Sequence, residues 1–424
     1  MGPRSAARRV GWRPALAALV LEAVEARTRT EGVPRDVVMT EVARFAREIV
    51  PSFNAYAYFR IGYWLARRIA ETLYRVRLGY VDDAGLSAVP PTASVVVVMN
   101  HRSNMDYVLV AYLAASRTAL SYAVGEWARI WPLQTLIRAM GAYFVRRNSG
   151  DALYRRVLER YVHMAVEAGV AQAIYPEGGL TRDGRLRLPR LGLLAYMVKS
   201  FDPEGSRDLV FIPVGINYDR VLEDRSLVRR LDAGAERKSG AAAARTTLGF
   251  VGRNVALMLR RRWYRFGYAC VSFGTPFSLR RYLAEEGRDF RDLGKDALFA
   301  EVDRLGRRLM TEVGKVVPVL PVSLIAAVFV RQEGVPLSEL ELKAKAHELA
   351  ARIEAAGARL YIPRADRDYA VTVGLRMLTL RHLVDDGDGL YRVRAGEEAV
   401  IGYYANAIAH FVDAVDGGSD PAPA

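Results

Sequence analysis

The sequence predicts an α/β protein with a mostly parallel, mixed sheet flanked by helices. The first observation is a set of short apolar runs at residues 94–99, 141–145, 170–175 and 209–214, typical of strands buried on both faces. The second is that helical patterns separate these runs along the chain. Because such alternation is typical of parallel sheets, functional residues are expected where strands end and loops begin.

A helical N-terminal layer is expected before the sheet. From Asp36, a suitable N-cap, apolar residues recur at helical spacing until Pro51, and a second helical stretch is expected over residues 54–77. The helices between the strands are expected at residues 107–115, 151–167 and 191–200.

Three regions are predicted along the chain. Residues 1–85 form a helical N-terminal region, residues 86–280 an α/β core, and residues 281–424 a mainly helical C-terminal domain with one or two short strands. Residues 316–330 are the most apolar stretch but are shorter than the roughly 20 residues of a spanning helix, so we expect them to be buried or interfacial. Arginines precede an apolar run at residues 15–21 without a convincing cleavage site, so no removed signal peptide is expected.

Charge and cysteine content restrict the function. The 424 residues have a formal net charge of +14, which predicts a polyanionic partner or surface, either nucleic acid or anionic lipid. The single cysteine, Cys270, rules out an internal disulfide and a cysteine-based metal site within one chain. A reducing, cytoplasmic compartment is therefore expected.

A candidate base follows the first strand. His101 stands just after residues 94–99, and Asp106 follows five residues later at the start of a predicted helix. In this arrangement Asp106 binds one imidazole nitrogen and the other faces a cleft, the pairing required to remove a proton from a hydroxyl. The spacing alone is a weak signal, since a histidine at a strand end is often structural.

Cationic and glycine-containing loops follow two later strands. The run at residues 141–145 leads into Arg146 and Arg147, and the run at residues 170–175 leads into Glu177, Gly178 and Gly179. The glycines permit close backbone approach. Downstream, Arg182 and Arg185 can direct guanidinium donors at a phosphate, although solvent-exposed arginines in a surface turn are the plainer interpretation.

Together, in this order, these segments resemble the four sequence blocks of the glycerolipid acyltransferases, and specifically the bacterial and mitochondrial glycerol-3-phosphate acyltransferases. The blocks correspond to residues 101–106, 141–147, 177–186 and 211–215. Further similarity lies in the segments 266–276 and 317–324 and in the Tyr-Tyr-Ala-Asn run at residues 403–406. The chain departs from the family pattern at Leu180, where the family often has arginine, and at Asn104.

The resemblance implies an acyltransferase core and an enzyme of phospholipid synthesis. It would transfer an acyl group from acyl-CoA or acyl carrier protein to the sn-1 hydroxyl of glycerol-3-phosphate, with His101 as general base oriented by Asp106. The substrate-binding candidates are the cations and loop residues of blocks two and three: Arg146, Arg147, Glu177, Gly178, Gly179, Arg182 and Arg185. No metal or other cofactor is implied.

A peripheral site on the cytoplasmic face of an anionic membrane is also expected. Residues 246–263 read as a basic amphipathic helix, in which Arg253, Arg260, Arg261, Arg262 and Trp263 are the membrane candidates. A helix packed against the core is the alternative for this segment.

Other functions remain as alternatives. The acceptor could be lysophosphatidate or dihydroxyacetone phosphate, or the chain could be a lipid-binding protein without catalysis. A nucleic-acid binder is disfavoured because no nucleic-acid motif accompanies the charge, and no nucleic-acid partner is expected.

Overall fold

A computed structural model of the chain describes residues 18–114, 120–125, 135, 138–146, 149–199, 201–231 and 265–417. The predicted membrane residues Arg253, Arg260, Arg261, Arg262 and Trp263, and the substrate candidate Arg147, lie outside these ranges.

The centre of the structure is an eight-stranded sheet with the order β1-β7-β6-β2-β5-β3-β4, in which β8 pairs with β6. Neighbouring strands are parallel, except that β6 is antiparallel to β7 and β8. The strands are β1 (Arg75–Val81), β2 (Ser94–Met99), β3 (Ser121–Gly125), β4 (Tyr143–Val145), β5 (Gln172–Ile174), β6 (Leu209–Tyr218), β7 (Tyr268–Phe273) and β8 (Phe277–Ser278). The predicted α/β class with a mostly parallel sheet is confirmed.

Both faces of the sheet are buried, as the apolar runs predicted. Along β2, Val97 and Met99 belong to one apolar cluster, whereas Val96 and Val98 belong to another on the opposite face. This alternation follows from the two-residue period of a strand. Each face therefore requires its own layer of helices.

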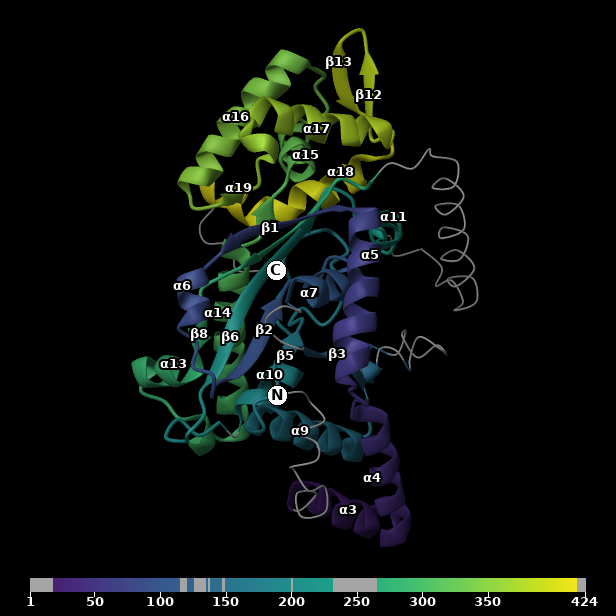
Figure 1. Cartoon of the computed structure of the whole chain (residues 1–424), viewed down its shortest axis with the longest axis vertical. Coiled ribbons are helices and arrows are strands. Elements are labelled where there is room, and N and C mark those ends of the chain that lie inside the picture. The colour runs from purple at the N-terminus through teal and green to yellow at the C-terminus, as the bar shows by residue number, and fades with distance from the viewer. Residues whose placement is uncertain are drawn as a thin grey trace.

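One layer contains the N-terminal helices and the helices between and after the strands (Figure 1). Its members are α3 (Ala18–Glu31), α4 (Arg35–Ile49), α9 (Ala152–Glu167), α10 (Leu191–Val198), α13 (Leu279–Glu286) and α14 (Lys295–Lys315). The opposite face is covered by α5 (Tyr63–Leu73), α7 (Asp106–Ala114) and α11 (Asp224–Arg229) together with the C-terminal helices.

The C-terminal helices form a layer at one end of the sheet, opposite α3 and α4 (Figure 1). They are α15 (Pro321–Arg331), α16 (Glu339–Ala355), α17 (Arg367–Leu380), α18 (Glu398–Ala405) and α19 (Ala409–Val415). Short strands accompany them: β9 (Pro318–Val319), β10 (Leu337–Ser338), β11 (Arg359–Leu360), β12 (Val384–Gly387) and β13 (Leu390–Val393). One apolar cluster joins these helices to the sheet. The predicted domain boundaries at residues 85 and 280 stay predictions.

Most predicted elements are present, but the helical stretch predicted over residues 54–77 was extended too far at its C-terminal end. A π-helical turn, η1 (Ala57–Gly62), leads into α5, which ends at Leu73, and Tyr74 is already extended. Residues from Arg75 pair instead with β7, which lies almost two hundred residues later. Local apolar spacing does not report such a distant partner, so the helical pattern was extended wrongly to Arg77.

The apolar stretch at residues 316–330 is buried inside the protein, one of its two expected positions. It forms β9 and α15, and from Pro321 to Phe329 every residue of α15 is buried. Among the described residues, no helix combines the length and apolarity required to cross a bilayer.

Candidate active site

The end of β2 places His101 next to Asp106. Asn100 anchors this turn to β6, because its side-chain amide donates to the Ile216 carbonyl and accepts from the Ile216 N–H at 2.9 and 2.8 Å. Helix α7 begins six residues after Asn100, with Asp106 as its first residue. The His101 Nδ1 to Asp106 Oδ2 distance is 2.9 Å, so the predicted pair is formed.

Asp106 is a carboxylate surrounded by hydrogen-bond donors. Besides His101 Nδ1, its Oδ2 accepts from the backbone N–H groups of Arg102 and Ser103 at 2.8 and 3.1 Å. Its Oδ1 accepts from the Tyr218 hydroxyl at 2.5 Å. With the carboxylate satisfied as an acceptor, Nδ1 carries the imidazole proton, and Nε2 is the nitrogen that can accept one.

Aromatic rings fix the plane of the imidazole. The Tyr175 ring stacks on His101 with a centroid distance of 4.1 Å and an interplanar angle of 29°. Tyr107 contacts it edge-on at 5.6 Å. The base is thus held by packing as well as by hydrogen bonds, as a preorganised site requires.

Glu177 supports the same turn from the loop after β5. Its Oε1 accepts from the His101 backbone N–H at 3.1 Å, whereas its buried Oε2 has no partner. Burial raises the pKa of Glu177 to about 8, against the His101 hydrogen bond and the positive charge of Arg102, which both lower it. The sequence predicts that Glu177 binds substrate, and this geometry indicates that Glu177 also orients the turn that carries His101.

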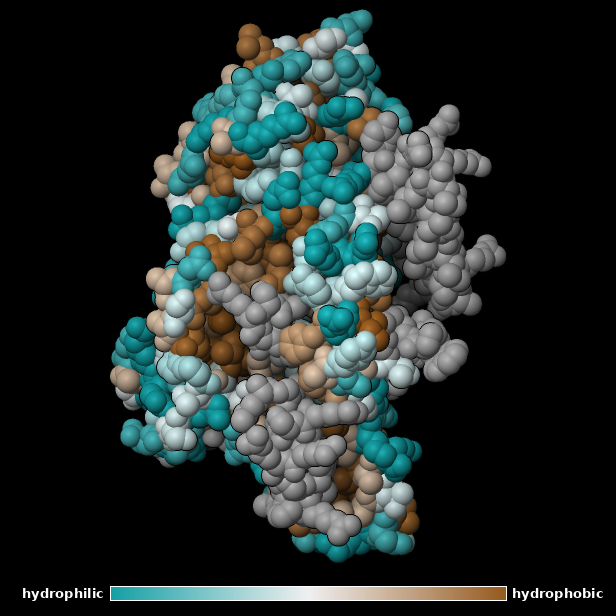
Figure 2. All heavy atoms as spheres, in the orientation of Figure 1, coloured by the Kyte–Doolittle hydropathy of each residue, from teal (hydrophilic) through white to brown (hydrophobic). Residues whose placement is uncertain are grey.

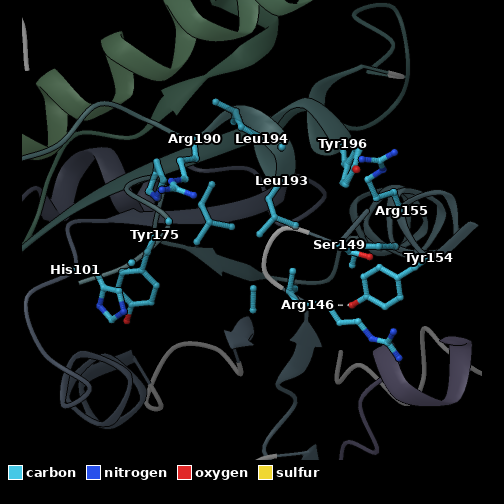
Figure 3. A pocket seen from close by; sticks show the side chains of 18 of the residues that line it. His101, Arg146, Ser149, Tyr154, Arg155, Tyr175, Arg190, Leu193, Leu194 and Tyr196 are labelled. Carbon is cyan, nitrogen blue, oxygen red and sulfur yellow. Dashed lines mark hydrogen bonds between the residues drawn. The ribbon is translucent and has the colours of Figure 1, made fainter. Parts of the chain in front are cut away.

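A cavity of about 410 Å³ opens beside His101. Figure 3 shows His101 and Tyr175 at one end, Leu193 in the middle, and Tyr154, Arg155 and Tyr196 at the other end. Helices α9 and α10 supply most of its apolar wall, and three arginines supply positive charge: Arg146, Arg155 and Arg190. The cavity therefore has the combination of apolar lining and few polar groups that is typical of small-molecule sites.

The predicted loop residues divide into two groups. Gly178, Gly179 and Arg146 line the cavity, although Arg146 also binds the Glu48 carboxylate through two nitrogens at 2.9 and 2.6 Å. Arg182 is exposed and Arg185 pairs with Asp413 at 3.0 Å, and neither lines the cavity.

Arg190 is a cavity residue that the sequence analysis missed. It lies at the His101 end of the cavity, above Tyr175 (Figure 3). Its side chain passes directly against Gly178. A Cβ on Gly178, whose φ is +68°, would lie 2.3 Å from Arg190 Cδ, so glycine is required there. No local sequence pattern singles out Arg190, because it reaches the cavity only through the folded path of the loop that follows Gly179.

The Tyr-Tyr-Ala-Asn run contacts both catalytic loops. The Arg102 guanidinium is buried, donates to the Gly184 carbonyl at 2.9 Å and lies 4.9 Å from the Tyr403 ring centroid. The Tyr403 hydroxyl donates to the Arg102 carbonyl at 3.3 Å, and the Asn406 amide donates to the Asp183 carbonyl at 2.9 Å. The C-terminal helices thus help to shape the loops after β2 and β5.

Glu223 is a second missed support. It accepts from the Ser103 hydroxyl at 2.8 Å and from the Asn104 side-chain and backbone N–H groups at 3.0 and 3.2 Å. Burial raises the pKa of Glu223. Asn104, one of the two departures from the family pattern, therefore has a structural partner within this chain.

Other chemistries find no support in the described residues. Cys270 is buried in β7, and burial raises its thiol pKa to about 12, so it is not a thiolate at neutral pH. Within the described part of the chain, no group of three or more histidine, cysteine or carboxylate side chains is arranged to hold a metal ion.

Comparison with known proteins gives two family matches. The acyltransferase family model matches residues 81–217, and the glycerol-3-phosphate acyltransferase C-terminal region matches residues 254–413. A curated glycerol-3-phosphate acyltransferase of Xylella fastidiosa (strain M23) is 28% identical over 336 residues, covering 77% of this chain and 37% of the relative. One of Pseudomonas putida (strain GB-1) is 27% identical over 339 residues, covering 77% and 39%. The chain thus spans less than half the length of these relatives.

Among solved structures, the 1-acyl-sn-glycerophosphate acyltransferase of Thermotoga maritima is similar at 15% identity with a TM-score of 0.33. The similarity covers 60% of this chain and 79% of that one. This likeness is too distant to carry an argument about the site.

Proposed function

We propose that this chain, which belongs to the glycerol-3-phosphate acyltransferase family by its two matched regions, transfers a fatty acyl group from a thioester to the sn-1 hydroxyl of glycerol-3-phosphate. The observation that carries the proposal is the His101 and Asp106 pair at one end of a cavity with arginines along its wall. The product would be lysophosphatidate, the first acylated intermediate of phospholipid synthesis.

The chemistry requires one base and no acyl-enzyme intermediate. His101 Nε2 removes the proton of the sn-1 hydroxyl while that oxygen attacks the thioester carbonyl carbon. The carbon–sulfur bond then breaks, and the leaving thiolate takes the proton from the imidazolium. Asp106, hydrogen-bonded to Nδ1, stabilises the imidazolium between the two steps.

Positive charge beside the base suits a small phosphorylated acceptor. Arg190 lies at the His101 end of the cavity, so it joins Arg146, Arg147, Arg182 and Arg185 as a candidate phosphate ligand. The apolar wall of Leu158, Leu193 and Leu194 suits the start of an acyl chain. The acyl donor is acyl-CoA or acyl carrier protein, and no further cofactor is required by this scheme.

The proposed place of action is the cytoplasmic face of the cell membrane, where the chain binds peripherally. The acyl donor and the product are both amphiphilic, and the net charge of +14 suits an anionic surface.

A matrix of donors and acceptors tests the proposal. Purified protein is given labelled acyl-CoA or acyl carrier protein with glycerol-3-phosphate, lysophosphatidate or dihydroxyacetone phosphate, and His101→Ala serves as the control. We expect glycerol-3-phosphate to have the highest kcat/KM and the control to lose roughly 10²–10⁴-fold in kcat. A kcat/KM for lysophosphatidate well above that for glycerol-3-phosphate would refute the acceptor, and a control within about tenfold of wild type would refute the base.

A further inference from the structure

The segment from η1 to α5 has an unusual distribution of side chains. Its buried positions recur at four-residue spacing and, after Tyr58, hold only small residues, namely Gly62, Ala66 and Ala70. Its outward positions hold Tyr56, Phe59, Ile61 and Trp64, which are 67%, 43%, 48% and 58% exposed. Tyr58, Ile69 and Leu73 face the protein. The four exposed side chains form a second apolar group on the outward side, where a surface helix in water normally has polar residues.

These side chains are concentrated in one place. Among the described residues, the large hydrophobic side chains with high exposure include four aromatic ones, and three of these four lie between Tyr56 and Trp64. Single exposed apolar residues are ordinary, whereas a contiguous exposed group marks an interaction surface.

The same surface is basic. Arg60, Arg67 and Arg68 are exposed along it, and Arg68 lies 5.9 Å from the Trp64 ring centroid. No aspartate or glutamate occurs between Pro51 and Glu71. Figure 2 shows hydrophobic and hydrophilic residues intermixed on the surface over α5.

The segment is also coupled to the catalytic helix. Helix α5 packs against α7, which begins at Asp106. The Tyr112 hydroxyl on α7 donates to the Glu71 carboxylate on α5 at 2.9 Å, and the Tyr63 and Tyr112 rings lie 5.7 Å apart. A partner that binds to α5 would therefore contact the helix that packs against α7, and α7 carries Asp106, the residue that supports His101.

We propose that this outward face, defined by Tyr56, Phe59, Ile61 and Trp64 with Arg60 and Arg68, docks onto the surface of an anionic lipid bilayer. Tyrosine and tryptophan suit the headgroup level because one edge of each ring is polar, and arginine is attracted to anionic headgroups. The absence of acidic side chains between Pro51 and Glu71 matches an anionic surface. The aromatic rings add apolar contact with the bilayer.

This outward face does not overlap the segments that the sequence predicts at a membrane, residues 246–263 and 316–330. Residues 316–330, considered above as interfacial, are mostly buried in α15. The inference rests on the proposed function in one respect: a membrane is the expected partner because the proposed thioester donor and product are amphiphilic.

Vesicle co-sedimentation tests the proposal. The full chain is titrated with vesicles of phosphatidylcholine containing about one quarter phosphatidylglycerol. The variant Phe59→Ser/Trp64→Ser should bind at least about tenfold more weakly than wild type, because two interfacial anchors are removed. Arg60→Gln/Arg68→Gln should bind more weakly on these vesicles and lose most of the salt dependence, without change on pure phosphatidylcholine.

The matched control is Phe299→Ser/Leu340→Ser, which removes two exposed apolar side chains, 42% and 78% exposed, from α14 and α16. It should bind like wild type, and thermal unfolding should show that all variants are folded. Wild-type binding by Phe59→Ser/Trp64→Ser overturns the proposal. The proposal is also overturned if the wild-type protein is a dimer in solution and Phe59→Ser/Trp64→Ser is a monomer, because the face would then bind a second copy of the chain.

The result is separable from the proposed function. The inactive His101→Ala protein should bind vesicles as wild type does. If wild type binds through this face but transfers no acyl group, the proposed function fails and the docking face stands.

Discussion

Replacing Asp106 by asparagine tests the charge of the supporting group with little change of shape. The asparagine carbonyl can take the place of Oδ2, which accepts from His101 Nδ1 and from the backbone N–H groups of Arg102 and Ser103. Its amide nitrogen then faces the Tyr218 hydroxyl oxygen. We therefore expect a folded protein that has lost only the negative charge beside the imidazole.

The magnitude follows from the geometry. His101 and Asp106 are 4% and 0% exposed, so solvent screens their interaction weakly. An imidazolium and a carboxylate about 4 Å apart attract by about 4 kcal/mol at an effective dielectric constant of about 20. Because about 1.4 kcal/mol corresponds to a factor of ten, Asp106→Asn should lower kcat by roughly 10³-fold.

The assay is transfer of labelled acyl groups to glycerol-3-phosphate at saturating donor and acceptor. Tyr218→Phe is the matched control, because it removes one hydrogen bond to the same carboxylate and leaves the charge in place. Its kcat should fall by about five- to tenfold, the effect of about 1 kcal/mol. Equal losses in the two variants, or an Asp106→Asn enzyme within about tenfold of wild type, would refute the assignment of a charge-stabilising role.

Three further predictions follow from the site. The pKa of Glu177 is about 8 in the folded chain against an ordinary 4.5, so the folded protein holds a proton that the unfolded chain has released, and its unfolding free energy falls as the pH rises between these values. Glu177→Gln removes this loss of stability with pH. In denaturant titrations, the unfolding free energy of the variant relative to wild type should therefore rise from about pH 5 to about pH 8, by up to about 1.4 kcal/mol per pH unit, and level off above. A difference that stays constant with pH would contradict the raised pKa. In steady-state kinetics, Arg190→Ala should raise the KM for glycerol-3-phosphate roughly 10–100-fold with the donor KM little changed. Arg182→Ala, also expected from the sequence to raise the acceptor KM, should raise it less because Arg182 does not line the cavity. A larger rise in acceptor KM for Arg182→Ala than for Arg190→Ala would place the phosphate site in the exposed loop. Tyr403→Ala should lower both kcat and the melting temperature, whereas Tyr403→Phe should keep most of each because the ring contacts Arg102; loss in both variants would assign the effect to the hydroxyl.

The base could be predicted from the sequence because its parts are local. His101 and Asp106 are five residues apart, and a buried strand followed by a helix leaves few ways to arrange them. The strand itself, residues 94–99, was predicted with the observed bounds because a valine run buried on both faces has no competing pattern.

The remaining supports could not be predicted because they depend on distant packing. Tyr218 reaches Asp106 only because β6 continues past the predicted strand end, and Glu223 follows a few residues later. Arg190 enters the cavity because Gly178 adopts a positive φ and lets its side chain cross the loop. Arg185 was assigned to phosphate from the sequence, but its partner Asp413 lies on the last helix and no local pattern reveals it.

The contact between Tyr403 and Arg102 has a consequence for how the protein is made. The two residues are 301 positions apart, and a ribosome adds about 5–20 residues each second, so roughly 15–60 s separate their synthesis. During that interval the loops after β2 and β5 exist without the ring and amide that hold them, and the apolar face awaiting the C-terminal helices is exposed. The nascent chain therefore carries an incomplete catalytic centre and an exposed apolar surface, and both are completed only when the C-terminal helices, α18 among them, pack onto the sheet.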